Sequence, residues 1–76
     1  MPIGYSRRIV AEIEQADTGK IGVRLAMICL LRDIPVKYVA DYLGVSRVTV
    51  YTWFRGKTNV PERLNVKVQK LINKLS

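Results

Sequence analysis

The stretch VKYVADYLGVSRVTVYTWFR, residues 36–55, decides the fold of this chain. Two short helices that cross at a tight turn need a small residue at their contact, a glycine where the first helix ends, and inward apolar residues on the second. The stretch supplies all of them. The packing residues are Val39, Ala40, Leu43, Gly44, Val45, Val50 and Trp53. The sequence therefore predicts one helix over 36–43 and, capped by Ser46, another over about 47–55.

Further helices are predicted on either side of this pair, and the sequence has no strand pattern. Ser6 can cap a helix that runs to about Ala16, and the break at residues 17–19 offers a cap to the next helix. The helix over about 20–32 is apolar almost all round, which is typical of a buried central helix. The helix over about 62–75 carries an apolar stripe formed by Leu64, Val68, Leu71, Ile72 and Leu75. We expect an all-α, compact bundle of about five short helices.

The composition of the 76 residues, 49% hydrophobic and 25% charged, is typical of a globular protein. From this length we expect a single domain over residues 1–76. A chain this short buries only about 60% of its unfolded surface, so its stability is marginal. The first residues carry arginines and glutamates, which argues against a secretory signal. The longest apolar run, residues 25–31, is far shorter than the ~20 residues that span a bilayer. We expect a soluble, cytoplasmic protein.

The sequence offers no residue set for catalysis or for a cofactor. It has no histidine and one cysteine, Cys29, which lies in the apolar helix and is interpreted as a small buried hydrophobe. Neither a Cys–His pair nor a common zinc site can be built from these residues. Paired carboxylates and a glycine-rich phosphate loop are also missing. We therefore expect no enzyme activity, no metal, no cofactor and no small-molecule ligand.

The whole chain carries a net charge of +7, and most of this positive charge lies in its second half. Residues 1–36 contain five basic and four acidic side chains, whereas residues 37–76 contain eight basic and two acidic ones. A basic half attached to a near-neutral half is expected where one face meets a polyanion. Charge alone fits nucleic acid, an anionic membrane or simple solubility.

The outward side chains after Gly44 differ from those of an ordinary solvated helix. Such a helix favours Glu, Lys and Gln, whereas no acid occurs over residues 44–61 and the outward side chains are mostly short hydroxyls and arginines. This surface can enter a major groove without repulsion from phosphates. Its residues are Ser46, Arg47, Val48, Thr49, Tyr51, Thr52 and Arg55. A helical hairpin without a DNA role explains the packing residues but not these.

Here the sequence resembles a known family. The pattern formed by Val39, Ala40, Gly44, Val45, Val50, Trp53 and Gly56 resembles the helix-turn-helix of the phage repressor and Cro (XRE-like) family. The resemblance is strong over residues 36–55 and implies a lambda-repressor-like DNA-binding domain. Val36 stands where family members often have glutamine, and the motif uses the third and fourth predicted helices rather than the second and third.

The docking geometry of that motif implies roles for single residues. The base-reading residues would be Arg47, Val48, Thr49 and Thr52, with Arg47 on guanine O6 and N7 and Val48 on a thymine methyl. A phosphate contact is the alternative for Arg47, Thr49 and Thr52. Contacts to the DNA backbone would come from Lys37, Tyr38, Ser46, Tyr51, Arg55, Lys57 and Asn59. Partial burial is an alternative for Tyr51. The basic stripe formed by Lys67, Lys70 and Lys74 is interpreted as a solvated face, with a contact to DNA as the alternative.

Several functions stay open at this level. The leading hypothesis is a small phage- or prophage-type transcriptional regulator that places the helix at 46–55 in the major groove of double-stranded DNA, inside a bacterial cell or a phage-infected host. One such helix reads few base pairs, so a homodimer is expected, either free or formed on DNA. The alternatives are a DNA-packaging or recombination and excision accessory factor, and a protein-interaction module that does not bind DNA.

Overall fold

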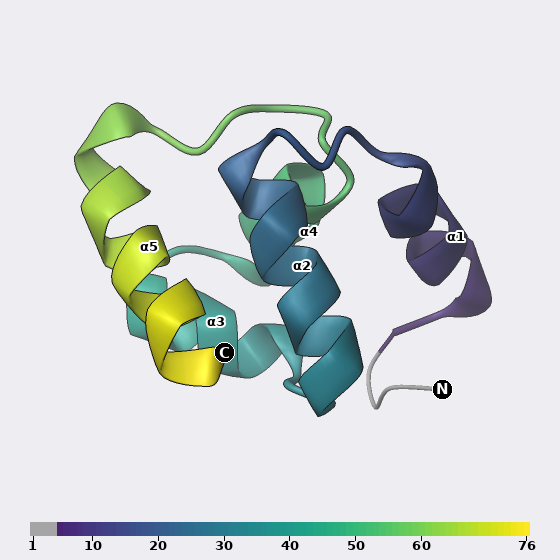
Figure 1. The fold of residues 1–76 in the computed structure, drawn as a ribbon, viewed down its shortest axis with the longest axis horizontal. Coiled ribbons are helices and arrows are strands. Elements are labelled where there is room, and N and C mark those ends of the chain that lie inside the picture. Colours follow the sequence, from purple (N-terminus) through teal and green to yellow (C-terminus); the bar gives the residue numbers. More distant parts are fainter. Residues whose placement is uncertain (1–4) are drawn as a thin grey trace.

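Five helices account for most of the described part of the chain, residues 5–76, in a computed structural model (Figure 1). They are α1 (Arg7–Gln15), α2 (Ile21–Arg32), α3 (Val36–Leu43), α4 (Arg47–Phe54) and α5 (Glu62–Leu75). No strand occurs among residues 5–76. The prediction of a small all-α bundle is confirmed.

Two serine caps and one glycine define helix ends close to those predicted from the sequence. The Oγ atoms of Ser6 and Ser46 accept the N–H groups of Ile9 at 3.2 Å and Thr49 at 3.1 Å. Gly44 ends α3 with φ of +70°, a left-handed conformation that costs glycine little. α1 and α4 each end one residue earlier than expected. Local chemistry thus fixed these boundaries closely.

The expectation that residues 17–19 cap α2 is wrong. Lys20 occupies the N-cap position, and its side chain makes no capping hydrogen bond. The Asp17 carboxylate instead accepts the N–H of Gly19 at 2.8 Å, which closes a local turn. At the other end of α2, Asp33 adopts a left-handed conformation with φ of 55°, which aspartate tolerates better than most residues.

α2 forms the centre of the bundle and packs against α1, α4 and α5 (Figure 1). Val23, Leu25, Ala26 and Cys29 are fully buried. The prediction of a central apolar helix is therefore confirmed, with one exception in its last turn. Leu31 is 82% exposed there, although the sequence made it part of the apolar run.

Two aromatic residues enter the core that the sequence analysis did not place there. Phe54 is fully buried, and its spacing from Val50 and Trp53 on α4 was the available signal. The Tyr5 ring stacks on Phe54 at 6.4 Å, and its hydroxyl donates to the Ile34 carbonyl at 2.8 Å. Burial raises the pKa of Tyr5 well above its usual range. The first described residue thus closes the core over α4.

Cys29 lies in this same core as an inert side chain. Burial raises the pKa of its thiol to about 12. The thiol therefore stays protonated at neutral pH, whereas the thiolate is the reactive form. The prediction that Cys29 acts as a small buried hydrophobe agrees with this environment.

Replacing Gly44 by alanine tests the turn between α3 and α4. A Cβ atom at Gly44 would meet nothing within 4 Å, so the only cost is the positive φ. We expect Gly44→Ala to lower the free energy of unfolding by about 1 kcal/mol, and Gly44→Asn by clearly less, because asparagine visits this conformation more readily. Urea midpoints of the three proteins measure the difference. Equal stability of the alanine and asparagine variants would contradict the conformational explanation.

Candidate nucleic-acid interface

The helices α3 and α4 form a packed pair joined by a short turn. The side chains that face inward at this junction are buried in the common core: Val39, Ala40, Leu43, Val50 and Trp53. Val45, in the turn, is half-buried against the same core, and its N–H donates to the Ala40 carbonyl at 3.1 Å. One side of α4 is therefore fixed by packing, which leaves its opposite side available at the surface.

The first turn of α4 presents the most open surface of this pair. Ser46, Arg47 and Val48 are exposed, and the Val48 side chain is 72% exposed. Arg47 has no hydrogen-bond or ion-pair partner among residues 5–76. Within the described part of the chain its guanidinium is therefore left to water or a ligand. This turn combines a free cation with an exposed apolar side chain.

The rest of the outward side of α4 is only partly exposed. The Thr49 hydroxyl lies 2.9 Å from Ser46 Oγ, and the Thr52 hydroxyl donates to the Thr49 carbonyl at 2.7 Å. Of the seven residues predicted to face outward, residues 46–48 are exposed, whereas Thr49, Tyr51, Thr52 and Arg55 are half-buried. A hydroxyl that donates within the helix can still accept a hydrogen bond from outside.

Tyr51 contacts Tyr5, in the segment before α1, and is partly exposed to solvent. Its ring meets the Tyr5 ring edge to face, with centroids 6.5 Å apart and an interplanar angle of 85°. The side chain is half-buried. The partial burial that was the alternative for Tyr51 is thus what the structure shows, and it fixes the ring beside the core.

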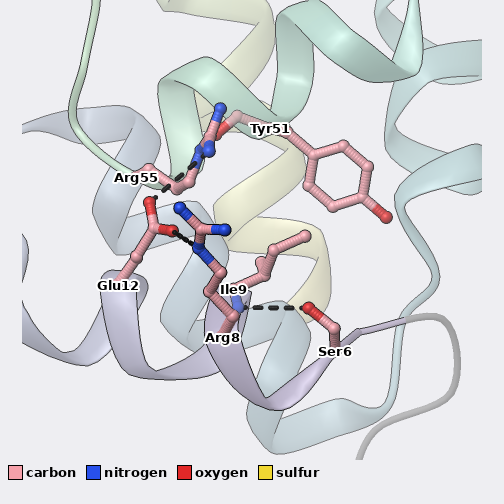
Figure 2. Close-up of polar contacts among 6 residues, drawn as sticks. All are labelled: Ser6, Arg8, Ile9, Glu12, Tyr51 and Arg55. Atoms are coloured by element: carbon pink, nitrogen blue, oxygen red, sulfur yellow. Dashed lines mark hydrogen bonds and ion pairs between the residues drawn. The ribbon is translucent and has the colours of Figure 1, made fainter.

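Arg55, which was assigned to the DNA backbone, is bound to α1. Its Nη1 lies 3.4 Å from Oε2 of Glu12, whose Oε1 lies 3.4 Å from Nε of Arg8 (Figure 2). Arg55 Nε also donates to the Tyr51 carbonyl at 3.3 Å. Two arginines thus share one carboxylate, and Arg55 spans α1 and α4. A phosphate at this position would compete with Glu12.

Removing either side of this ion pair tests its contribution. Both side chains are a little under a third exposed. We expect Glu12→Gln and Arg55→Gln each to lower the free energy of unfolding by about 0.5–1 kcal/mol, with a double variant that costs less than the sum. Thermal unfolding of the single and double variants measures the coupling. Strict additivity would show that the two groups do not interact in solution.

The remaining backbone-contact candidates lie on α3 and in the segment after α4. Lys37 pairs with Asp41 at 3.2 Å on an open surface, where such pairs contribute little. Lys57 and Asn59 are exposed in the segment between α4 and α5. A contact that the sequence analysis missed fixes this segment: Lys20 Nζ donates to the Gly56 carbonyl at 2.9 Å.

Comparisons with protein-family models, with curated proteins and with solved structures found no match for this chain. The resemblance to the phage repressor and Cro family therefore rests on the motif residues themselves. Among residues 5–76, no helix is both long and apolar enough for a membrane crossing, and no cluster of potential metal-ligating side chains occurs.

Proposed function

We propose that this chain binds double-stranded DNA at specific sequences through a helix-turn-helix formed by α3 and α4. The observation that carries the proposal is the exposed first turn of α4, Ser46–Val48, whose opposite side is held by buried Val50 and Trp53. A major groove about 12 Å wide admits one such helix. No carboxylate lies between Gly44 and Pro61 to repel the phosphates on either side.

The exposed turn supplies the two kinds of contact that distinguish base pairs. The Arg47 guanidinium has no ion-pair partner among residues 5–76, and it can donate two hydrogen bonds to guanine O6 and N7. Val48 can pack on a thymine methyl. Thr49 and Thr52 lie further round and along α4, half-buried, and take smaller parts in reading. Sequence preference therefore depends most on Arg47.

Backbone contacts set affinity and register around this turn. Lys57 and Asn59 are exposed just after α4, and Lys37 and Tyr38 are exposed at the start of α3. Cations at such positions release counterions from the phosphates on binding. Arg55 takes part only if a phosphate displaces Glu12. We propose that the protein acts as a small transcriptional regulator of the phage or prophage type, as a homodimer on a site with two halves.

Selection from a pool of random duplexes tests the proposal. We expect the wild-type protein to enrich a short common sequence, and to bind random duplexes more weakly with a steep dependence on salt. A matched selection with Arg47→Ala is the control for α4. Recovery of unenriched sequences by the wild-type protein, with salt-independent retention, would exclude DNA reading and favour a protein-interaction module.

A further inference from the structure

A basic face on α5 lies beside two tyrosines of α3. The face consists of Arg63, Lys67, Lys70 and Lys74, spaced so that all four lie on one side of the helix, and all are exposed. The only acid of α5, Glu62, lies at its first residue. No cation of this face forms an ion pair among residues 5–76. The α5 basic face is thus a strip of uncompensated positive charge.

Aromatic contacts hold part of this strip in place. The Nζ atoms of Lys67 and Lys74 lie 5.5 and 5.8 Å from the centre of the Tyr42 ring. That ring is stacked on Tyr38, with centroids 6.5 Å apart and planes at 18°. Cation–π contacts of this kind restrict lysines that otherwise sample many rotamers. The interpretation of the stripe as an ordinary solvated face does not account for this ordering.

The two ordered lysines lie on a length of helix over which a duplex presents several phosphates. Lys67 and Lys74 are separated by two turns, about 10 Å along the helix axis. A duplex presents roughly one charge per 1.7 Å of its length, so several phosphates fall within this span. The ammonium groups keep their N–H donors because a ring face accepts no proton from them in a conventional hydrogen bond. Preordering of this kind lowers the entropic cost of binding.

We infer that Tyr38, Tyr42, Lys67 and Lys74 form a second contact surface for the phosphate backbone of duplex DNA, separate from the first turn of α4. The inference rests on the proposed function, and it extends the backbone contacts from the start of α3 across to α5. Because these side chains meet phosphates alone, the surface adds affinity and salt dependence without adding sequence preference.

Binding measurements on charge variants test the inference. We expect Lys67→Gln/Lys74→Gln to lower the slope of log K against log salt by about 1.8 and affinity by about tenfold at low salt, equally for selected and random duplexes. Arg7→Gln/Arg24→Gln removes the same charge from exposed positions on α1 and α2 and is expected to keep the wild-type slope. Lys67→Arg/Lys74→Arg is expected to retain binding. Equal salt slopes for Lys67→Gln/Lys74→Gln and Arg7→Gln/Arg24→Gln would overturn the inference.

Backbone amide NMR shifts of the wild-type protein, titrated with duplex, separate the inference from the proposed function. Shifts at both α4 and α5 support both. Shifts at α4 alone leave the proposed function standing and overturn the inference. Shifts at α5 alone overturn reading by α4 and leave the contact between DNA and α5. No shifts at either helix overturn both. Shifts of α5 with polyglutamate but not with duplex would assign the basic face to an acidic protein and overturn the inference.

Discussion

Gly22→Ala is expected to destabilise the protein by about 2 kcal/mol, although glycine-to-alanine changes inside helices ordinarily stabilise by about 0.5–1 kcal/mol. A Cβ atom at Gly22 would lie 2.8 Å from the Trp53 carbonyl oxygen and 2.9 Å from the Trp53 Cβ. Both atoms belong to the fixed part of α4, so no side-chain rotation relieves the contact. α2 and α4 must move apart, and buried apolar packing is lost.

Thermal unfolding measures this effect directly. For a chain of this size, we expect the melting temperature of Gly22→Ala to fall by about 8–16 °C. Arg24→Ala is the matched control, because Arg24 is exposed on the same helix and its replacement should leave stability nearly unchanged. A melting temperature at or above that of the wild type would show that the helices do not approach this closely. Because the contact between Gly22 and Trp53 positions α4, we expect the affinity of Gly22→Ala for DNA to be lower as well.

Arg47→Ala is expected to relax the sequence preference at one base pair. A bidentate contact to guanine is worth about 1–3 kcal/mol of discrimination. The ratio of affinities for the preferred site and its single-base variant should therefore fall roughly tenfold to a hundredfold. Stability should stay unchanged because Arg47 is exposed and forms no ion pair with any described residue. Competition binding with the selected duplex and its single-base variants measures the change.

Lys57→Ala provides the contrast for Arg47→Ala. Lys57 is exposed in the segment after α4, where a phosphate contact gives no sequence information. We expect this variant to weaken binding to all duplexes alike and to lower the salt slope by about 0.9. If Arg47→Ala instead behaves in this same uniform way, then Arg47 contacts the backbone and base reading lies elsewhere on α4.

Much of the fold followed from signals that act over a few residues. Ser6 and Ser46 cap helices, Gly44 ends one in the left-handed conformation, and the apolar stripe of α5 is buried except for Leu75, which is half-buried. These features depend on backbone geometry and on the helical repeat, which a sequence displays directly. The exposed start of α4 followed from the same pattern, because the inward positions of Val50 and Trp53 define the outward ones.

Contacts between distant segments could not be predicted in this way. Arg55 meets Glu12 across 43 residues, and Lys20 meets the Gly56 carbonyl across 36. Nothing local distinguishes these cations from the free Arg47. The tight approach at Gly22 likewise depends on how α2 crosses α4, which a single helix pattern does not specify. Hence Arg55 was grouped with the DNA contacts, although the structure ties it to α1.

The most direct measurement replaces single guanines of the selected duplex by 7-deazaguanine, which has carbon in place of the N7 acceptor in the major groove. Reading by the first turn of α4 predicts that one such replacement weakens binding of the wild-type protein and has no effect on binding of Arg47→Ala. Undiminished affinity of the wild-type protein at every replaced guanine would contradict base reading by Arg47 in the major groove.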